Sequence, residues 1–132
     1  MELEISRAAF DAIVAHAREA APRECCGLLI GLGAQIESAH RSRNVDPSPT
    51  RFLIDPHDHF VALRAARAGG REVVGVYHSH PSTPARPSAT DLTEASDAEC
   101  AYVIISLAVD PPEVRLFRLE AGAFVEEPLS RL

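Results

Sequence analysis

Two histidines stand two residues apart in the segment GVYHSHPSTPARPSATDL, which spans residues 75–92. His78 and His80 end an apolar run that is typical of a strand. Residues i and i+2 of a strand face the same side, about 6.5 to 7 Å apart at their Cα atoms, so both imidazoles can point at one position. The end of a strand is also where open α/β sheets tend to hold ligands. The H-x-H pattern alone favours ordinary surface histidines, and it indicates a candidate metal site only if the rest of the chain supplies a further ligand.

A metal ion at this position needs a third ligand, and Asp91 offers a suitable carboxylate oxygen. Two histidines and one carboxylate match a catalytic zinc site that keeps a fourth position for water. Zinc in such a site lowers the pKa of the bound water to about 7, which makes hydroxide available at neutral pH. Taken alone, Ser88 and Asp91 form the S-x-x-D pattern of an ordinary helix N-terminus. The two interpretations are compatible, because a cap holds its acidic residue rigidly.

The rest of the chain predicts the elements that position these residues. Hydrophobic periodicity and end signals favour helices at residues 7–20, 56–68 and 88–98. Strands are expected at residues 3–5, 25–32, 34–40, 51–54, 72–78, 101–109, 113–119 and 123–129. Ser6 should cap the first helix, and Phe60, Leu63 and Ala66 should face inward on the second. This order predicts an α/β (α+β) fold, a mixed β-sheet flanked by helices, in a single domain over residues 1–132.

The composition argues against several classes of function. The formal net charge is −6, whereas nucleic-acid binding requires clustered Lys and Arg side chains that neutralise phosphates. No apolar run approaches the roughly 18 residues of a membrane span, and the N-terminus MELEIS lacks the features of a signal peptide. A soluble, cytoplasmic protein that binds neither nucleic acid nor membrane is therefore expected.

The three cysteines form neither a C-x-x-C pair nor an even-numbered disulfide framework. Cys25 and Cys26 are adjacent and should point to opposite faces of a strand, which argues against a shared zinc site. We expect them to be buried apolar thiols. Cys100 is a poor candidate nucleophile, because an apolar setting raises the pKa of a thiol.

A second H-x-H pattern lies in the segment DPHDH at residues 55–59. If the second helix forms, His57 and His59 lie about 200° apart around its axis and cannot share one metal ion. The pattern is therefore not expected to be a second metal site.

Three separated segments resemble the JAMM (MPN+) family of metalloproteases. HSHP at residues 78–81, followed by Ser88 and Asp91, reproduces the metal motif of that family. ECCGLLIG at residues 24–31 resembles the family segment in which a glutamate precedes a strand that enters the core. RNVDPSPTRFLIDP and the late strands AYVIISL and VRLFRL are similar to compact bacterial members. The resemblance covers nearly the whole chain in the expected order.

The resemblance implies a role for each matching residue. His78, His80 and Asp91 match the ligands of one catalytic Zn²⁺ ion. Glu24 matches the general acid/base that holds the water and passes its proton to the leaving amine, a transfer typically worth about 10²- to 10⁴-fold. Ser88 matches the residue whose hydroxyl stabilises the oxyanion, where one lost donor can cost about 10²- to 10³-fold. Without the downstream motif, Glu24 would be interpreted as an ordinary exposed acid.

The family cleaves bonds to the C-terminus of ubiquitin or of ubiquitin-like proteins. The resemblance therefore implies a zinc-dependent isopeptidase or peptidase that acts at the Gly-Gly tail of a ubiquitin-like or sulfur-carrier protein. The chain has no room for the long insertions with which eukaryotic deubiquitinases grip a second ubiquitin. Two alternatives stay open, a hydrolase of small peptide amides and a non-catalytic MPN-type interaction module. The sequence favours no particular carrier, leaving group or oligomeric state.

Overall fold

A mixed β-sheet forms the centre of the computed structural model, which describes residues 2–94 and 100–132. The strands found in these residues are β1 (Leu3–Ile5), β2 (Cys26–Leu32), β3 (Gln35–Ser42), β4 (Glu72–His80), β5 (Ala101–Ser106), β6 (Glu113–Glu120), β7 (Ala123–Glu127) and β8 (Leu129–Arg131). The helices are α1 (Arg7–Ala20), α2 (Pro56–Ala68) and α3 (Ala89–Glu94). None of these helices has the length and apolar character that crossing a membrane requires.

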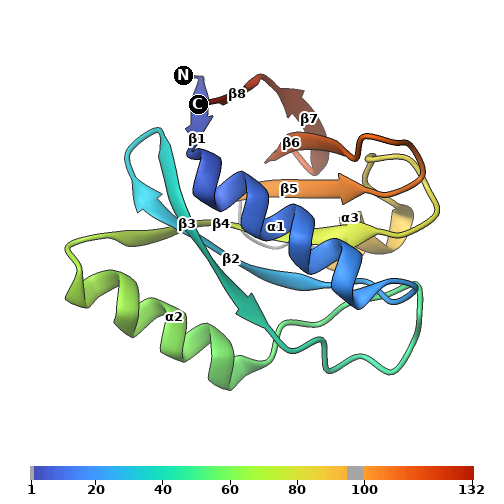
Figure 1. The fold of residues 1–132 in the computed structure, drawn as a ribbon, viewed down its shortest axis with the longest axis horizontal. Coiled ribbons are helices and arrows are strands. Elements are labelled where there is room, and N and C mark those ends of the chain that lie inside the picture. Colours follow the sequence, from blue (N-terminus) through green and yellow to red (C-terminus); the bar gives the residue numbers. More distant parts are fainter. Residues whose placement is uncertain (1, 95–99) are drawn as a thin grey trace.

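The strand order in the sheet is β7-β6-β5-β4-β2-β3-β1-β8. β4 pairs with β5 in parallel and β1 with both β3 and β8 in parallel, whereas the other neighbours are antiparallel. In Figure 1, α1 lies in front of the sheet, α3 lies behind β4 and β5, and α2 lies beside β2 and β3. The prediction of an α/β (α+β) fold with a mixed sheet flanked by helices is confirmed.

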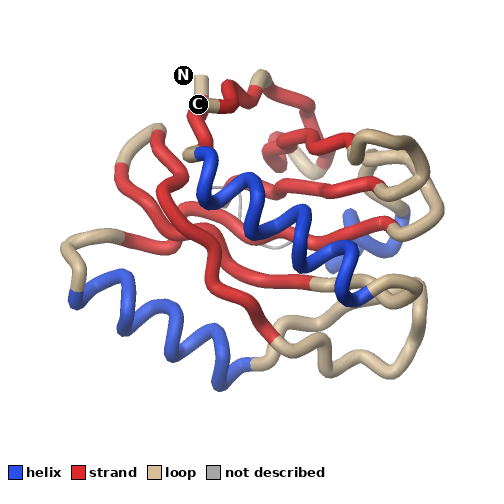
Figure 2. The backbone as a smooth tube through the Cα atoms, viewed as in Figure 1, coloured by secondary structure: helices blue, strands red, loops and turns tan. Residues whose placement is uncertain are grey.

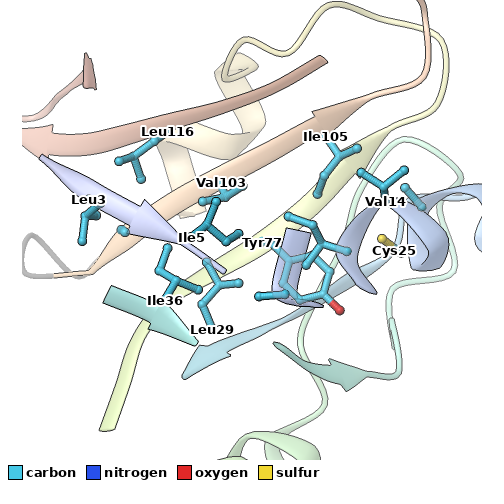
Figure 3. Close-up of a cluster of buried hydrophobic side chains, with 14 residues drawn as sticks. Leu3, Ile5, Val14, Cys25, Leu29, Ile36, Tyr77, Val103, Ile105 and Leu116 are labelled. Atoms are coloured by element: carbon cyan, nitrogen blue, oxygen red, sulfur yellow. The ribbon is translucent and has the colours of Figure 1, made fainter. Parts of the chain in front are cut away.

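The main core lies between α1 and the sheet (Figure 3). The Ser6 side chain caps α1 by accepting a hydrogen bond from the Ala9 amide at 3.0 Å, as the sequence predicts. One stripe of α1 is buried and contributes Ile13 and Val14 to the core. These side chains pack in one cluster with residues of the central strands, including the fully buried Tyr77 of β4.

The inward face predicted for the second helix is only partly right. Ala66 is buried, but Phe60 is 56% exposed and Leu63 is 42% exposed, so the prediction for these two residues is wrong. Instead, the small side chains of Ala62 and Ala66 make the buried face of α2. The larger apolar side chains of α2 are consequently left outside its contact with the sheet.

Two strand predictions need correction. Residues 51–54 form no regular strand, and only Ile54 makes an isolated bridge, to Asn44. The segment belongs to the long connection between β3 and α2 (Figure 2). The predicted last strand, residues 123–129, is two strands at opposite edges of the sheet, β7 and β8, because Pro128 has no N–H for a ladder and interrupts the pairing.

Several other boundaries differ from the predictions. β2 begins at Cys26 rather than at residue 25, and β3 spans Gln35–Ser42 rather than residues 34–40. β4 continues to His80, and β5 ends at Ser106, three residues before the predicted end. α3 runs from Ala89 to Glu94. The remainder of the helix predicted at residues 88–98 lies outside the described residues.

Candidate metal centre

At the end of β4 the side chains alternate between the two faces of the sheet, so His78 and His80 share one face. Cys26 of β2 pairs with His78 in the antiparallel register, and the Ser79 amide donates to the Cys25 carbonyl at 3.1 Å. This register places Glu24 across from His80, just before β2 begins. Because opposite residues of an antiparallel pair share a face, Glu24 and His80 lie on the same side of the sheet as His78.

Three side chains from two elements converge at this end of β4. His78 Nε2 and His80 Nε2 are 3.1 Å apart, and each lies 3.2 Å from Asp91 Oδ2. Within the described residues, one group of histidine, cysteine and acidic side chains could share a metal ion, and it consists of these three residues. Ligands that hold a tetrahedral zinc ion at about 2.0 to 2.1 Å lie about 3.3 Å apart. The observed spacing and the N₂O donor set therefore fit zinc.

The orientation of His80 is fixed by the loop that follows β4. Its Nδ1 lies 2.9 Å from the carbonyl oxygen of Pro84, and a carbonyl can only accept a hydrogen bond. Nδ1 must therefore carry the proton, which leaves the lone pair of Nε2 for a metal ion.

An aromatic side chain covers the other histidine. The ring of Phe52 stacks on the imidazole of His78, with 4.3 Å between centroids and 18° between planes. Both histidines are almost completely buried. Sequence reasoning missed Phe52, because the RFLI segment was interpreted as a strand rather than as a cover for this site.

Asp91 is held by a reciprocal cap at the start of α3. The Asp91 amide donates to Ser88 Oγ at 3.0 Å, and the Ser88 amide donates to Asp91 Oδ2 at 2.8 Å. The same carboxylate oxygen also faces both histidines. The cap and the three-residue cluster thus coexist. Ser88 is exposed, and its hydroxyl accepts from Asp91 through a lone pair and so keeps a proton to donate.

The electrostatics of the cluster favour a charged carboxylate facing imidazole. Burial raises the pKa of Asp91, but its hydrogen-bonded contacts with His78 and His80 outweigh burial and hold that pKa far below its usual range. Burial lowers the pKa of His78 despite the bond to Asp91. Burial also lowers the pKa of His80, but the bonds to Asp91 and Pro84 and the charges of Asp91 and Glu24 reverse this and raise it.

Glu24 is 8% exposed, whereas the sequence without its motif would suggest an exposed acid. The strand register places Glu24 across from His80 on the same face as the cluster, and its charge contributes to raising the pKa of His80. The fold therefore brings Glu24, from before β2, to the same end of the sheet as His78, His80 and Asp91. It also brings Ser88 there, through the cap with Asp91.

A cleft of about 420 Å³ begins at the cluster. Its walls come from the sheet, from α2 and from the segment before α2. The lining residues include His78 and Asp91 at one end and the apolar side chains of Phe52, Leu63, Val76, Tyr102 and Phe124 along the walls. Leu63 lines this cleft rather than the core, which explains its exposure.

The remaining candidate groups do not join the cluster. His59 lines the cleft from α2, and the only metal-binding group found in the described residues contains neither His57 nor His59. Cys25 and Cys26 are free and buried, and burial raises their pKa values to about 11 and about 12. Both thiols therefore stay protonated at neutral pH.

Two histidines and a carboxylate that meet at a strand end, with a buried glutamate and an apolar cleft nearby, are typical of metal-dependent hydrolases. Residues 6–120 match the family described as prokaryotic homologues of the JAB domain. The chain belongs to this family. The prediction of a JAMM-type metallopeptidase is confirmed at the level of the family.

Named relatives agree with this assignment, and a solved structure shares the fold. The chain is 37% identical over 124 residues to a CysO-cysteine peptidase of Mycobacterium tuberculosis, covering 91% of this chain and 84% of the relative. It is 38% identical over 111 residues to a desampylase of Haloferax volcanii, covering 79% of this chain and 80% of the relative. The solution structure of a Desulfitobacterium hafniense protein matches with a TM-score of 0.86 and 36% identity, covering all of this chain and 93% of that one.

Proposed function

We propose that this protein is a zinc-dependent peptidase that hydrolyses the amide bond after the C-terminal Gly-Gly of a ubiquitin-like or sulfur-carrier protein. The observation that carries the proposal is the convergence of His78, His80 and Asp91 within 3.2 Å of one another, at the strand end that also holds the buried Glu24. The substrate class is supported by the names of two relatives, a CysO-cysteine peptidase and a desampylase.

In this proposal His78, His80 and Asp91 hold the zinc ion through Nε2, Nε2 and Oδ2. When bound, zinc supplies a Lewis acid and lowers the pKa of a water molecule toward 7. Glu24 accepts the proton of the attacking water and delivers it to the departing nitrogen. This residue is only 8% exposed, so the carboxylate is shielded from bulk water while it exchanges the proton.

Ser88 is positioned to donate to the oxygen of the scissile carbonyl as negative charge develops there. Its hydroxyl accepts from the Asp91 amide at 3.0 Å, which fixes the oxygen beside the cluster and leaves the proton for the substrate. Such a donor is worth about 10²- to 10³-fold in rate.

The cleft accounts for recognition of an extended tail. Glycine residues present no side chain, so a Gly-Gly segment can approach the cluster closely. The residues that precede it would contact the apolar walls, which include Phe52, Leu63 and Val76. A tail bound along the apolar walls would displace water from the cleft, and this would strengthen the electrostatic interactions of the reacting groups.

The test is cleavage of a sulfur carrier fused through its Gly-Gly terminus to cysteine. We expect a strong chelator to abolish cleavage and added zinc to restore it. Glu24→Gln should retain one zinc ion per chain and lose cleavage, whereas Glu120→Gln, a control at an exposed acid at the end of β6, should behave like the unmodified protein. Full turnover in chelator, or in Glu24→Gln, would contradict the proposed mechanism.

The same assay separates the two alternatives. A hydrolase of small amides should release cysteine from the peptide Gly-Gly-Cys as readily as from the carrier fusion. An interaction module should cleave neither substrate, with or without zinc. The proposed function requires efficient cleavage of the carrier fusion and much slower cleavage of the peptide.

A further inference from the structure

One peptide group of the chain, the group that joins Glu24 to Cys25, is held from both ends by side chains. Its carbonyl oxygen, which belongs to Glu24, accepts a hydrogen bond from Asn44 Nδ2 at 3.0 Å. Its N–H, which belongs to Cys25, donates to Ser79 Oγ at 2.8 Å. Asn44 and Ser79 come from opposite neighbours of β2, so they hold this peptide group across its full width.

The regular hydrogen bonds between strands do not hold the 24–25 peptide group, because β2 begins only at Cys26. Cys26 pairs with Ser42 of β3, so the same register carried two residues outward places Glu24 beside Asn44. The backbone at Asn44 has already turned away to form a bridge with Ile54. The side chain of Asn44 takes the place of the missing backbone donor on this side.

The side-chain amide of Asn44 is fully used. Besides the Glu24 carbonyl, Nδ2 donates to the Arg51 carbonyl at 3.0 Å. Oδ1 accepts from the amides of Asp46 and Leu53, both at 3.0 Å. Two of these bonds flank Phe52, the residue that stacks on His78. Asn44 therefore connects the backbone of Glu24 to the segment that covers a candidate metal ligand.

Ser79 lies between the two histidines but serves the other face of the sheet. It is 0% exposed, and its neighbours in β4 alternate with it, so its side chain points away from the cluster. Its amide donates to the Cys25 carbonyl at 3.1 Å while its hydroxyl accepts from the Cys25 amide. Ser79 thus joins the strand that carries both histidines to the residue that follows Glu24.

We propose that Asn44 and Ser79 are positioning residues that fix the Glu24 carboxylate relative to the metal centre. The inference rests on the proposed function, in which Glu24 transfers the proton. Rotation of the 24–25 peptide group would swing the Cα–Cβ bond of Glu24 and move the carboxylate out of reach of the reacting water. A displacement of about 1 Å at a catalytic group can cost about 10²-fold in rate.

The experiment measures zinc content, kcat and KM for variants of the full chain with the carrier fusion. Ser79→Ala removes the acceptor of the Cys25 amide. It should lower kcat about 10- to 100-fold, the range found for residues that orient a metal site, and leave one zinc ion per chain and KM within about twofold. Ser79→Thr keeps a hydroxyl and should recover most of kcat. Ser42→Ala removes a buried hydroxyl of β3 that has no bond to this peptide group, and should leave kcat unchanged.

The decisive readout is the effect of Ser79→Ala in a chain that already carries Glu24→Gln. If Ser79 acts through Glu24, the residual rate of Glu24→Gln should change by less than about twofold. Asn44→Ala releases the other end of the peptide group and should show the same dependence on Glu24. If Ser79→Ala does not fold, Asn44→Ala tests the positioning role independently.

Several results would overturn the inference, and two of them concern variants that do lose activity. One is an equal loss of kcat in both backgrounds, and the other is a loss of zinc in parallel with activity. A Glu24→Gln chain with full kcat would instead refute the proposed function itself. An inactive Glu24→Gln chain with an unaffected Ser79→Ala chain would refute only the positioning role.

Discussion

The two faces of β4 differ in what covers them. On one face, the side chain of Tyr77 is fully buried under α1, and its hydroxyl lies 2.7 Å from Nδ1 of His16. On the other face, His78 and His80 meet Asp91, and an open cleft begins beside them. Neighbouring residues of a single strand thus belong to a closed core and to a candidate reaction site.

The difference follows from the helices that pack on each face. α1 covers its face with Ile13 and Val14, so little of the sheet is left uncovered there. α2 packs through Ala62 and Ala66, and the larger side chain of Leu63 lines the cleft. We therefore expect changes on the α1 face to alter the free energy of unfolding and changes on the cleft face to alter zinc binding and turnover.

The largest effect should come from the cleft face. His80→Ala removes one of three ligand atoms, so zinc binding should be lost, and with it several kcal/mol of transition-state stabilisation, about 10³-fold in rate or more. The melting temperature in the presence of chelator should stay within a few degrees of that of the unmodified protein. Without metal, the buried cluster holds a charged carboxylate and two imidazoles away from water, so removing one imidazole should cost little stability. Zinc content, turnover and thermal unfolding provide the measurements. A His80→Ala variant that keeps full turnover, or that unfolds at ambient temperature, would contradict the expectation that the cleft face controls turnover and the α1 face controls stability.

The next effect concerns the α1 face. A Cβ atom at Gly27 would lie 2.4 to 2.5 Å from the ring and hydroxyl of Tyr77, which has no room to move in the core. Gly27→Ala should therefore lower the free energy of unfolding by about 1 to 3 kcal/mol through overpacking, with kcat of the folded protein unchanged. Urea unfolding with zinc present measures the loss. The matched control is Gly69→Ala, where the nearest atom lies 3.7 Å from the added Cβ, and this variant should be close to neutral.

The faces differ as well in how far the sequence predicts them. H-x-H at a strand end, the caps at Ser6 and Ser88, and the order of elements are local patterns, and they predict the mixed sheet and the grouping of His78, His80 and Asp91. The structure brings these three side chains together, and their role as zinc ligands stays a prediction. Local patterns suffice here because the strand period and the cap geometry fix the side-chain directions.

The covering of each face depends on contacts between distant segments, which the local pattern does not contain. Phe60 and Leu63 follow helical spacing but are exposed, because the small residues beside them make the contact with the sheet. The apolar letters RFLI suggest a strand, yet bonds from the Asn44 side chain shape this segment so that Phe52 reaches His78. The Asn44 amide gives no periodic signal, so its role could be found only in three dimensions.

A smaller effect should separate packing from hydrogen bonding on the α1 face. Tyr77→Phe keeps the buried ring but removes the hydroxyl that lies 2.7 Å from His16 Nδ1. We expect the free energy of unfolding to fall by about 1 to 2 kcal/mol, because a half-buried polar atom loses its partner, while zinc content and kcat stay unchanged. Urea unfolding and the cleavage assay together check this. A fall in kcat without a fall in stability would show that the hydroxyl acts on the cleft face.

The smallest effect is a dependence of stability on pH. Burial, together with the charge of Arg41, lowers the pKa of His16 from about 6.5 to about 4. Between these values the unfolded chain binds a proton at this residue that the folded chain does not, so the free energy of unfolding falls as the pH falls. Because the ring is half exposed and screened by solvent, this contribution should be no more than about 1 kcal/mol at pH 5. His16→Gln removes the titrating group, so zinc-saturated protein carrying it should lose less stability than the unmodified protein between pH 7 and pH 5. Urea unfolding at the two pH values measures the loss. If His16→Gln and the unmodified protein lost the same free energy of unfolding between pH 7 and pH 5, His16 would titrate normally and the α1 face would be less closed than its packing indicates.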